Sequence, residues 1–187
     1  FTGYAWFRRS CTLESDMTGL VSILTLERTR VSTLYIDGTE IGTCDSLCSS
    51  HRYDISSYMT AGTHEIVIRV ANVGYKTGGG HMTSPDTQTN WLGIVGKMNI
   101  EIYPKSYISD VRVIASADGS LLVRGLVNGA DNAVVTATVT APGGIRVLKA
   151  NIISDGDTFE AEFRLENAQL WDEFERNIYS LELRCGE

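Results

Sequence analysis

Apolar and polar positions alternate with a period of two through most of the chain. In residues 65–70, Glu65, Val67 and Arg69 alternate with two isoleucines and a valine, which is typical of a β-strand with one buried face. Asp37-Gly38 follows the apolar run 31–36 and signals a hairpin. The same reasoning predicts strands over residues 20–26, 31–36, 65–70, 97–103, 109–115, 120–128, 133–141, 146–153, 158–165 and 178–184. Many short strands separated by turn signals predict an all-β chain of sandwiches.

Helix signals are few. Residues 56–60 suit a single turn, and residues 166–176 place Ala168, Leu170 and Phe174 among good helix formers. Periodicity does not decide between a short helix and a loop at 166–176.

One long segment, residues 72–90, lacks strand character and is rich in glycine, serine and threonine. A loop of this length in a compact domain is usually functional or mobile. After Pro104 a fresh set of about seven strands begins, which suits an immunoglobulin-like sandwich. We therefore predict two domains, residues 1–104 and 105–187.

Composition narrows the function classes. The chain has 187 residues and a net charge of −7 with scattered basic residues, which argues against nucleic acid as a partner. No apolar run is long enough to span a bilayer, so we expect no membrane partner. The four cysteines, Cys11, Cys44, Cys48 and Cys185, are expected to be free thiols, although an oxidising compartment would allow one bridge. They lack zinc-ligand spacing, and neither a metal nor another cofactor is predicted.

Titratable side chains offer no catalytic pattern. Glu160 and Glu162 share one face of a predicted strand, opposite Phe159 and Phe163, as expected for a solvated face. Asp172-Glu173 is expected in a polar loop, and His51 and His64 at the surface or in loops. Acid–base catalysis by carboxyl groups needs a pair of them in a pocket, one with a raised pKa. Because the acidic side chains here are expected in solvent, no catalytic residue is assigned.

Residues 81–91 are the best candidate for ligand contact. Asp86, Gln88, Asn90 and Trp91 supply hydrogen-bonding groups and an aromatic ring within six residues, and His81 precedes them in the glycine-rich loop. Sugars are held by such groups. The alternatives are an exposed loop histidine, a strand-start cap for Asn90 and domain packing for Trp91.

Trp6-Phe7-Arg8-Arg9 forms a second group near the N-terminus. A strand would place Trp6 and Arg8 on one face and Phe7 and Arg9 on the other. Core packing with an ion pair between strands is favoured here over sugar contact.

Several segments resemble the sugar-binding domain of glycoside hydrolase family 2, which includes β-galactosidases, β-glucuronidases and β-mannosidases. No single motif is specific, but their order and spacing are. They are Gly3-Tyr4-Ala5-Trp6-Phe7-Arg8-Arg9, Tyr35-Ile36-Asp37-Gly38-Thr39-Glu40-Ile41-Gly42, Tyr53-Asp54-Ile55-Ser56, residues 62–72 and Asn90-Trp91-Leu92-Gly93-Ile94-Val95-Gly96. Leu170-Trp171 and Ile178-Tyr179-Ser180-Leu181 resemble the end of the family's immunoglobulin-like domain. Asp37 stands where asparagine is usual, and the prolines of the last motif are missing.

The resemblance implies a fold for each predicted domain and places catalysis in a separate domain. Residues 1–104 would be a jelly-roll (galactose-binding-like) β-sandwich and residues 105–187 an immunoglobulin-like β-sandwich. Catalysis in this family belongs to a (β/α)₈ barrel with two glutamates and a retaining mechanism, and 187 residues are too few to include one. We therefore expect an inactive accessory fragment of a retaining exo-β-glycosidase, most simply β-galactosidase-like. Its partners would be the missing barrel and a β-linked carbohydrate, contacted by Asp86 or Asn90.

Two other interpretations stay open. The chain could be a stand-alone carbohydrate-binding module, or an interaction sandwich without a sugar role. We expect no measurable sugar binding by the isolated chain, because one loop offers too few groups to offset its own ordering. A periplasmic or secreted location is favoured over a cytoplasmic one.

Overall fold

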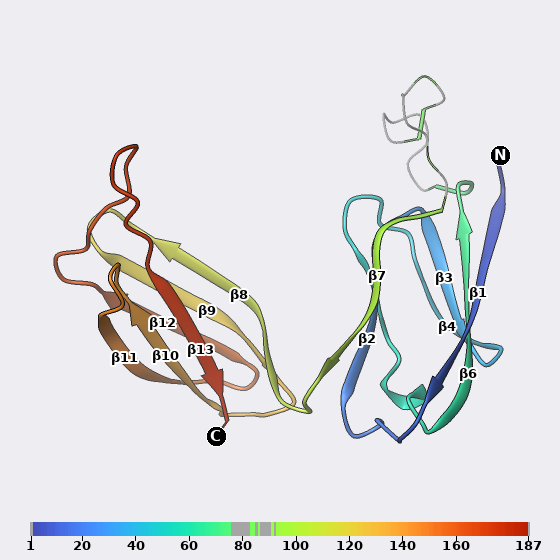
Figure 1. The fold of residues 1–187 in the computed structure, drawn as a ribbon, viewed down its shortest axis with the longest axis horizontal. Coiled ribbons are helices and arrows are strands. Elements are labelled where there is room, and N and C mark those ends of the chain that lie inside the picture. The colour runs from blue at the N-terminus through green and yellow to red at the C-terminus, as the bar shows by residue number, and fades with distance from the viewer. Residues whose placement is uncertain (1, 76–82, 85, 87–90, 92, 187) are drawn as a thin grey trace. The chain divides into compact units, whose positions relative to one another are not determined.

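The computed structural model describes residues 2–75, 83–84, 86, 91 and 93–186, and it is built of strands (Figure 1). The chain divides into two compact units, Phe1–Pro104 and Lys105–Glu187, here called unit 1 and unit 2. No helix among the described residues has the length and apolar character needed to cross a membrane.

Unit 1 consists of two antiparallel sheets. One has the order β1-β6-β3-β4 and the other β5-β2-β7. Their bounds are β1 Tyr4–Leu13, β2 Val21–Thr29, β3 Val31–Ile36, β4 Thr39–Cys44, β5 His51–Asp54, β6 Gly62–Ala71 and β7 Ile94–Tyr103. Leu24 and Leu26 of β2 pack in one core with Leu34 of β3 and Ile68 of β6. Side chains of both sheets therefore share one interior, as in a β-sandwich.

Unit 2 repeats this plan with six strands. Its sheets have the orders β12-β9-β8 and β11-β10-β13. The bounds are β8 Tyr107–Ala115, β9 Ser120–Asn128, β10 Val134–Thr140, β11 Arg146–Ile153, β12 Thr158–Arg164 and β13 Ser180–Cys185. Val123 and Phe159 of one sheet meet Val135 and Val139 of the other in a buried core. The prediction of an all-β chain made of β-sandwiches is confirmed.

The sequence signals for the hairpin at Asp37-Gly38 and for the turn at 56–60 were accurate. Asp37 and Gly38 have φ values of 50° and 78°, and Ile36 pairs with Thr39 across them. Two positive φ angles in a two-residue loop make the turn that suits twisted strands, so the predicted hairpin is confirmed. The single turn predicted at 56–60 is the 3₁₀ turn Ser56–Tyr58.

Of the two possibilities left open at residues 166–176, the structure has the loop. The Asp172 carboxylate accepts hydrogen bonds from the backbone N–H groups of Phe174 and Glu175 at 2.8 and 2.6 Å, and the Asn177 amide donates to the Leu170 carbonyl at 2.9 Å. These bonds hold an irregular loop instead, because a short aspartate side chain competes with helix formation for backbone N–H groups. Three strands were not among the predicted ones: β1, β4 and β5. The four residues of β5 are too few to show a period, and β4 was indicated only by the hairpin signal before it.

Candidate functional site

The long segment between β6 and β7 is anchored at both of its ends in unit 1. At the first end, the Asn72 side chain accepts a hydrogen bond from the Gly3 N–H at 2.8 Å, and the Asn72 N–H donates to the Gly3 carbonyl at 3.2 Å. At the second end, the Thr29 hydroxyl donates to the Gly93 carbonyl at 3.2 Å. The segment thus leaves and re-enters the sandwich at fixed points.

Arg30 is the central side chain of this anchor. It lies between β2 and β3 and is only 4% exposed. Its Nε donates to the Trp91 carbonyl at 3.1 Å, and its guanidinium carbon lies 4.6 Å from the centre of the Trp91 ring and 6.0 Å from that of Tyr75. A guanidinium between aromatic faces is held by cation–π attraction. Burial raises the pKa of Tyr75 above its usual value.

The predicted sugar-binding residues fall into three groups. Trp91 is half-buried and stacks on Arg30, so its ring is an anchor as well as a candidate contact. Asp86 is exposed, and its N–H donates to the Ser84 hydroxyl at 3.1 Å. His81, Gln88 and Asn90 lie outside the described residues. The structure therefore places Asp86 at the surface and Trp91 at the base of the same segment.

Sequence reasoning missed Arg30. The signal that could have found it is a charged residue in the single-residue connection between two largely apolar strands. A charge there must be exposed or paired, and aromatic residues at the ends of a nearby long loop supply the pairing.

His51 corrects another prediction. It was expected at the surface, but it is fully buried. Its Nε2 lies 2.7 Å from the Ser46 carbonyl and its Nδ1 lies 2.6 Å from the Ser32 hydroxyl, which also contacts the Tyr53 hydroxyl at 2.6 Å. A carbonyl only accepts, so the Ser46 carbonyl assigns a hydrogen to Nε2, whereas the Ser32 hydroxyl can either donate to Nδ1 or accept from it. Burial raises the pKa of Tyr53, which keeps its hydroxyl a donor.

The N-terminal aromatic group also departs from expectation. Arg8 of β1 forms the predicted ion pair between strands with Glu65 of β6. Core packing is wrong for Trp6, which is 59% exposed, and Phe7 is exposed too. The reason is that β1 is the edge strand of its sheet, so few side chains cover it.

The acidic side chains considered for catalysis lie in solvent. Glu160 and Glu162 are exposed on β12 while Phe159 is buried, which confirms the solvated face. Glu160 lies 3.9 Å from Arg124. Asp172 accepts the two turn hydrogen bonds described above. In the part of the chain that the structure describes, no group of three or more histidine, cysteine or acidic residues could hold a metal ion.

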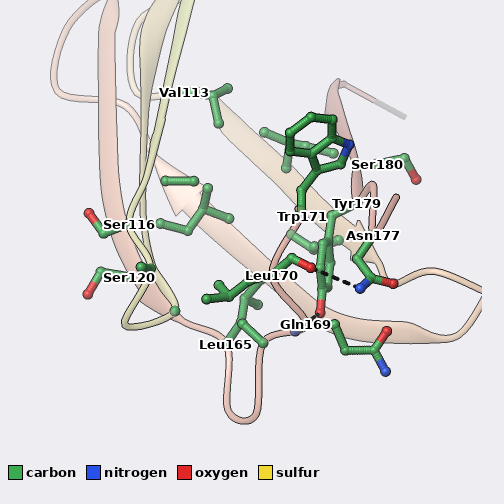
Figure 2. A pocket seen from close by; sticks show the side chains of 17 residues that line it. Val113, Ser116, Ser120, Leu165, Gln169, Leu170, Trp171, Asn177, Tyr179 and Ser180 are labelled. Carbon is green, nitrogen blue, oxygen red and sulfur yellow. Dashed lines mark hydrogen bonds between the residues drawn. The ribbon is translucent and has the colours of Figure 1, made fainter. Parts of the chain in front are cut away.

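Unit 2 contains an apolar hollow of about 390 Å³ between its sheets (Figure 2). Leu165, Leu170 and Tyr179 lie around it, and the Tyr179 hydroxyl accepts a hydrogen bond from the Gln169 N–H at 2.9 Å. Trp171 lies at its rim and is 63% exposed. Its lining includes no carboxylate, histidine, lysine or arginine, so it offers no acid–base pair for hydrolysis.

Three comparisons relate the chain to known proteins. A scan against family models finds no match. A provisionally named β-glucuronidase of Formosa agariphila is 22% identical over 98% of this chain, which spans 23% of that protein. The solved β-glucuronidase of Faecalibacterium prausnitzii matches 100% of the chain at 20% identity with a TM-score of 0.75, and 36% of that structure is covered.

A β-glucuronidase of Bifidobacterium dentium, solved with coumarin-3-O-glucuronide, matches 99% of the chain at 18% identity with a TM-score of 0.75. The chain again spans 36% of that structure. It therefore covers between 23% and 36% of the three proteins described here. The chain has the fold of the corresponding part of these β-glucuronidases, and the resemblance to glycoside hydrolase family 2 extends over its whole length.

Proposed function

We propose that the chain is the accessory, two-sandwich part of a longer retaining β-glycosidase whose catalytic barrel lies elsewhere in the polypeptide. The observation that carries this proposal is the extent of the likeness. The match covers 98–100% of this chain but only 23–36% of the three proteins described above. A complete likeness to a minor part of a larger enzyme is what an accessory region would give.

Within that enzyme, unit 1 would present the segment after β6 to the substrate. The exposed Asp86 carboxylate would accept hydrogen bonds from sugar hydroxyls, with His81, Gln88 and Asn90 as further candidates. Trp91 would fix the base of the segment through Arg30. Support comes from the two fixed ends of the segment and from the buried Arg30 on which Trp91 stacks.

The substrate proposed here is a β-glucuronide. The sequence favoured a β-galactosidase-like parent, whereas the relatives found are named as β-glucuronidases. The chain itself would be inactive, because the catalytic glutamates of this family belong to the barrel.

Two measurements test the proposal. Purified chain should not hydrolyse chromogenic β-glucuronide, β-galactoside or β-mannoside, and activity that co-elutes with it through successive columns would overturn the assignment. The gene should continue beyond these codons into a (β/α)₈ barrel with an Asn-Glu pair near its fourth strand. A stop codon directly after Glu187 would contradict the proposal.

A second candidate is a stand-alone carbohydrate-binding module. The ring pair of the exposed Trp6 and the half-buried Tyr35 favours it, because aromatic platforms bind the apolar faces of sugars. The gene sequence separates the two candidates, since a module needs no barrel.

A further inference from the structure

The outer face of the sheet β1-β6-β3-β4 carries an unusual group of side chains. The register places Trp6 opposite Arg69, and Arg69 opposite Thr33, so these three project from one face. The neighbouring Ile68 and Leu34 project from the other face into the core. Figure 1 shows the four strands side by side in unit 1. The outer face is therefore defined by strand alternation, independently of the long segment after β6.

Two aromatic rings meet above the middle of this face. The rings of Trp6 on β1 and Tyr35 on β3 have centres 5.9 Å apart and planes inclined by 33°. Both strands flank β6, so the rings reach across it toward each other. Tyr4 lies on the same face as Trp6, two residues along β1, and is 54% exposed. Such rings offer apolar contact area with few rotatable bonds to immobilise.

Arg69 completes the group, which we call the platform: Tyr4, Trp6, Tyr35 and Arg69. The guanidinium carbon of Arg69 lies 5.4 Å from the ring centre of Tyr4 and 5.8 Å from that of Trp6. Its Nη2 donates to the Thr33 hydroxyl at 2.9 Å. This hydrogen bond leaves the other N–H groups of the Arg69 guanidinium able to donate to a ligand.

The charge of Arg69 is not neutralised by any carboxylate that the structure describes. Glu65 on the same face is paired with Arg8, and Glu40 lies opposite Tyr35 on the outer strand β4. An arginine held by aromatic rings and a hydroxyl is preorganised for a carboxylate, which it can grip with two parallel hydrogen bonds.

The border of the platform is polar. Thr43 lies beyond Thr33, and their hydroxyls are 2.7 Å apart. Further along the face, the hydroxyls of Thr12 and Thr63 are 3.0 Å apart. The apolar part consists of the three rings and Val67, which pairs with Tyr35 across the strands, whereas protein interfaces of standard size need about 800 Å² per partner with an apolar centre. A small ligand with one apolar face and many hydroxyls fits this surface better.

We propose that the platform binds an acidic carbohydrate. The C–H face of a sugar ring would lie on Trp6 and Tyr35, and the carboxylate of a uronate would pair with Arg69. The expectation of no measurable binding took account of the long segment alone, and the platform adds rings and a cation to it. The inference holds whether the chain works alone or within a longer enzyme.

The test is to titrate carbohydrate into the purified 187-residue chain. Binding is measured by calorimetry and by changes in the chemical shifts of backbone amides. The acidic probe is a hyaluronan hexasaccharide, which carries glucuronate at alternate positions, and the neutral probe is cellohexaose. We expect a Kd of about 1 mM or tighter for hyaluronan, at least tenfold weaker binding of cellohexaose, and shifts centred on β1, β3 and β6. Added salt should weaken hyaluronan binding because the charge pair is exposed.

Variants distinguish binding at the platform from non-specific binding elsewhere on the chain. Trp6→Ala and Arg69→Met should each weaken hyaluronan binding by about tenfold or more. Arg69→Lys should recover part of the affinity, since a lysine keeps the charge but not the fork. Trp171→Ala, which removes a similarly exposed tryptophan from unit 2, should leave the affinity unchanged. A thermal melt of each variant establishes that it is folded.

Three outcomes would overturn the proposal. One is no hyaluronan binding at about 10 mM, a concentration about tenfold above the expected Kd. Another is a lack of specificity for the platform and the charge: equal binding of the two hexasaccharides, or a folded Trp6→Ala variant that binds hyaluronan as tightly as the parent. The third is a dimer of the chain that Trp6→Ala converts to monomer without any effect of hyaluronan, which would assign the platform to a second copy of the chain.

Discussion

The two sandwiches differ most in what they bury. Among the described residues, seven buried polar side chains lie in unit 1, and only Ser154 lies in unit 2. Those of unit 1 are Ser22, Thr25, Thr29, Arg30, Ser32, Thr33 and His51. Unit 2 instead fills its core with valine, leucine, isoleucine, alanine and Phe159. The same architecture is thus supported in two different ways.

This difference affects how side chains are held in the two units. Buried polar groups must find partners, so they fix the positions of particular side chains. In unit 1 they order the Ser32–His51–Tyr53 network, the Arg30 anchor and the Thr33 hydroxyl that holds Arg69. The apolar core of unit 2 provides stability through the burial of apolar side chains. Unit 1 therefore fixes individual polar side chains, whereas unit 2 depends on apolar packing.

The largest expected effect tests the apolar support of unit 2. Phe159 is 2% exposed and its ring leaves no room for a Cβ at Gly125. Phe159→Ala should destabilise unit 2 by about 3–5 kcal/mol, because it removes a large buried side chain and leaves a cavity. Urea unfolding followed by the fluorescence of Trp171 should shift strongly. Phe174→Ala, at an 86% exposed site, is the control.

Unit 1 should be almost unaffected by Phe159→Ala. Its unfolding can be followed through Trp6 and Trp91 in a Trp171→Phe background. If both units lose stability together, the two sandwiches unfold as one cooperative body and the comparison above fails.

The second prediction tests the polar support of unit 1. Ser32→Ala removes the hydroxyl partner of His51 Nδ1, which then lies buried without that hydrogen bond. We expect a loss of about 1–3 kcal/mol from unit 1, the usual penalty for leaving a buried polar atom unsatisfied. Ser50→Ala, at an exposed position beside His51, should change little. Equal stability of Ser32→Ala and the parent would show that the network does not support the fold.

The third prediction addresses the anchor of the long segment. Arg30→Met keeps most of the side-chain volume but removes the cation from the Trp91 ring and the hydrogen bond to its carbonyl. Unit 1 should lose about 1 kcal/mol. In a Trp6→Phe/Trp171→Phe background, Trp91 emission should move to longer wavelength as the ring becomes more exposed. Unchanged emission would mean that Arg30 does not hold Trp91.

The smallest effect concerns pH. The hydrogen bond with Asp37, at 2.7 Å, and the Thr60 carbonyl raise the pKa of His64. The Glu65 N–H and His64 lower the pKa of Asp37. A raised histidine pKa stabilises the fold below the ordinary value of about 6.5, and this contribution is lost as pH rises through the raised pKa.

The melting temperature of unit 1 should therefore fall slightly more between about pH 6 and pH 8 in the parent than in Asp37→Asn. Asparagine tolerates the positive φ of this position and its Oδ1 still accepts the Glu65 N–H, so the turn is kept. The substitution removes the charge and replaces the Oδ2 acceptor of His64 with an NH2 group. Parallel pH profiles for the two proteins would show that the pair contributes nothing.

Most of the fold could be predicted from the sequence because strand signals are local. The alternation in residues 65–70 correctly placed Ile68 and Val70 in the core, and Asp37-Gly38 correctly marked the hairpin. Residues 166–176 were left open between a helix and a loop, because propensity could not foresee that Asp172 would accept hydrogen bonds from the backbone N–H groups of its own loop.

The site was less accessible to sequence reasoning. Asp86 and Trp91 were chosen for their chemistry, but nothing in the sequence indicated that Arg30, about sixty residues away, would stack on Trp91. His51 was expected at the surface because histidine is commonly partly exposed. Its two hydrogen-bond partners are brought to it by the tertiary structure: Ser32 lies on strand β3, and Ser46 lies in the loop after β4.

What the sequence by itself determined was the sheet-forming character of the chain, since side chains on a strand alternate whatever the partner strand is. It also determined which face of β1 and of β6 each residue occupies. Only the tertiary structure decided which faces meet. Pairing β1 and β3 with opposite edges of β6 put Trp6, Tyr35 and Arg69 together, because strand order is set by the packing of the whole sandwich and not by local pattern.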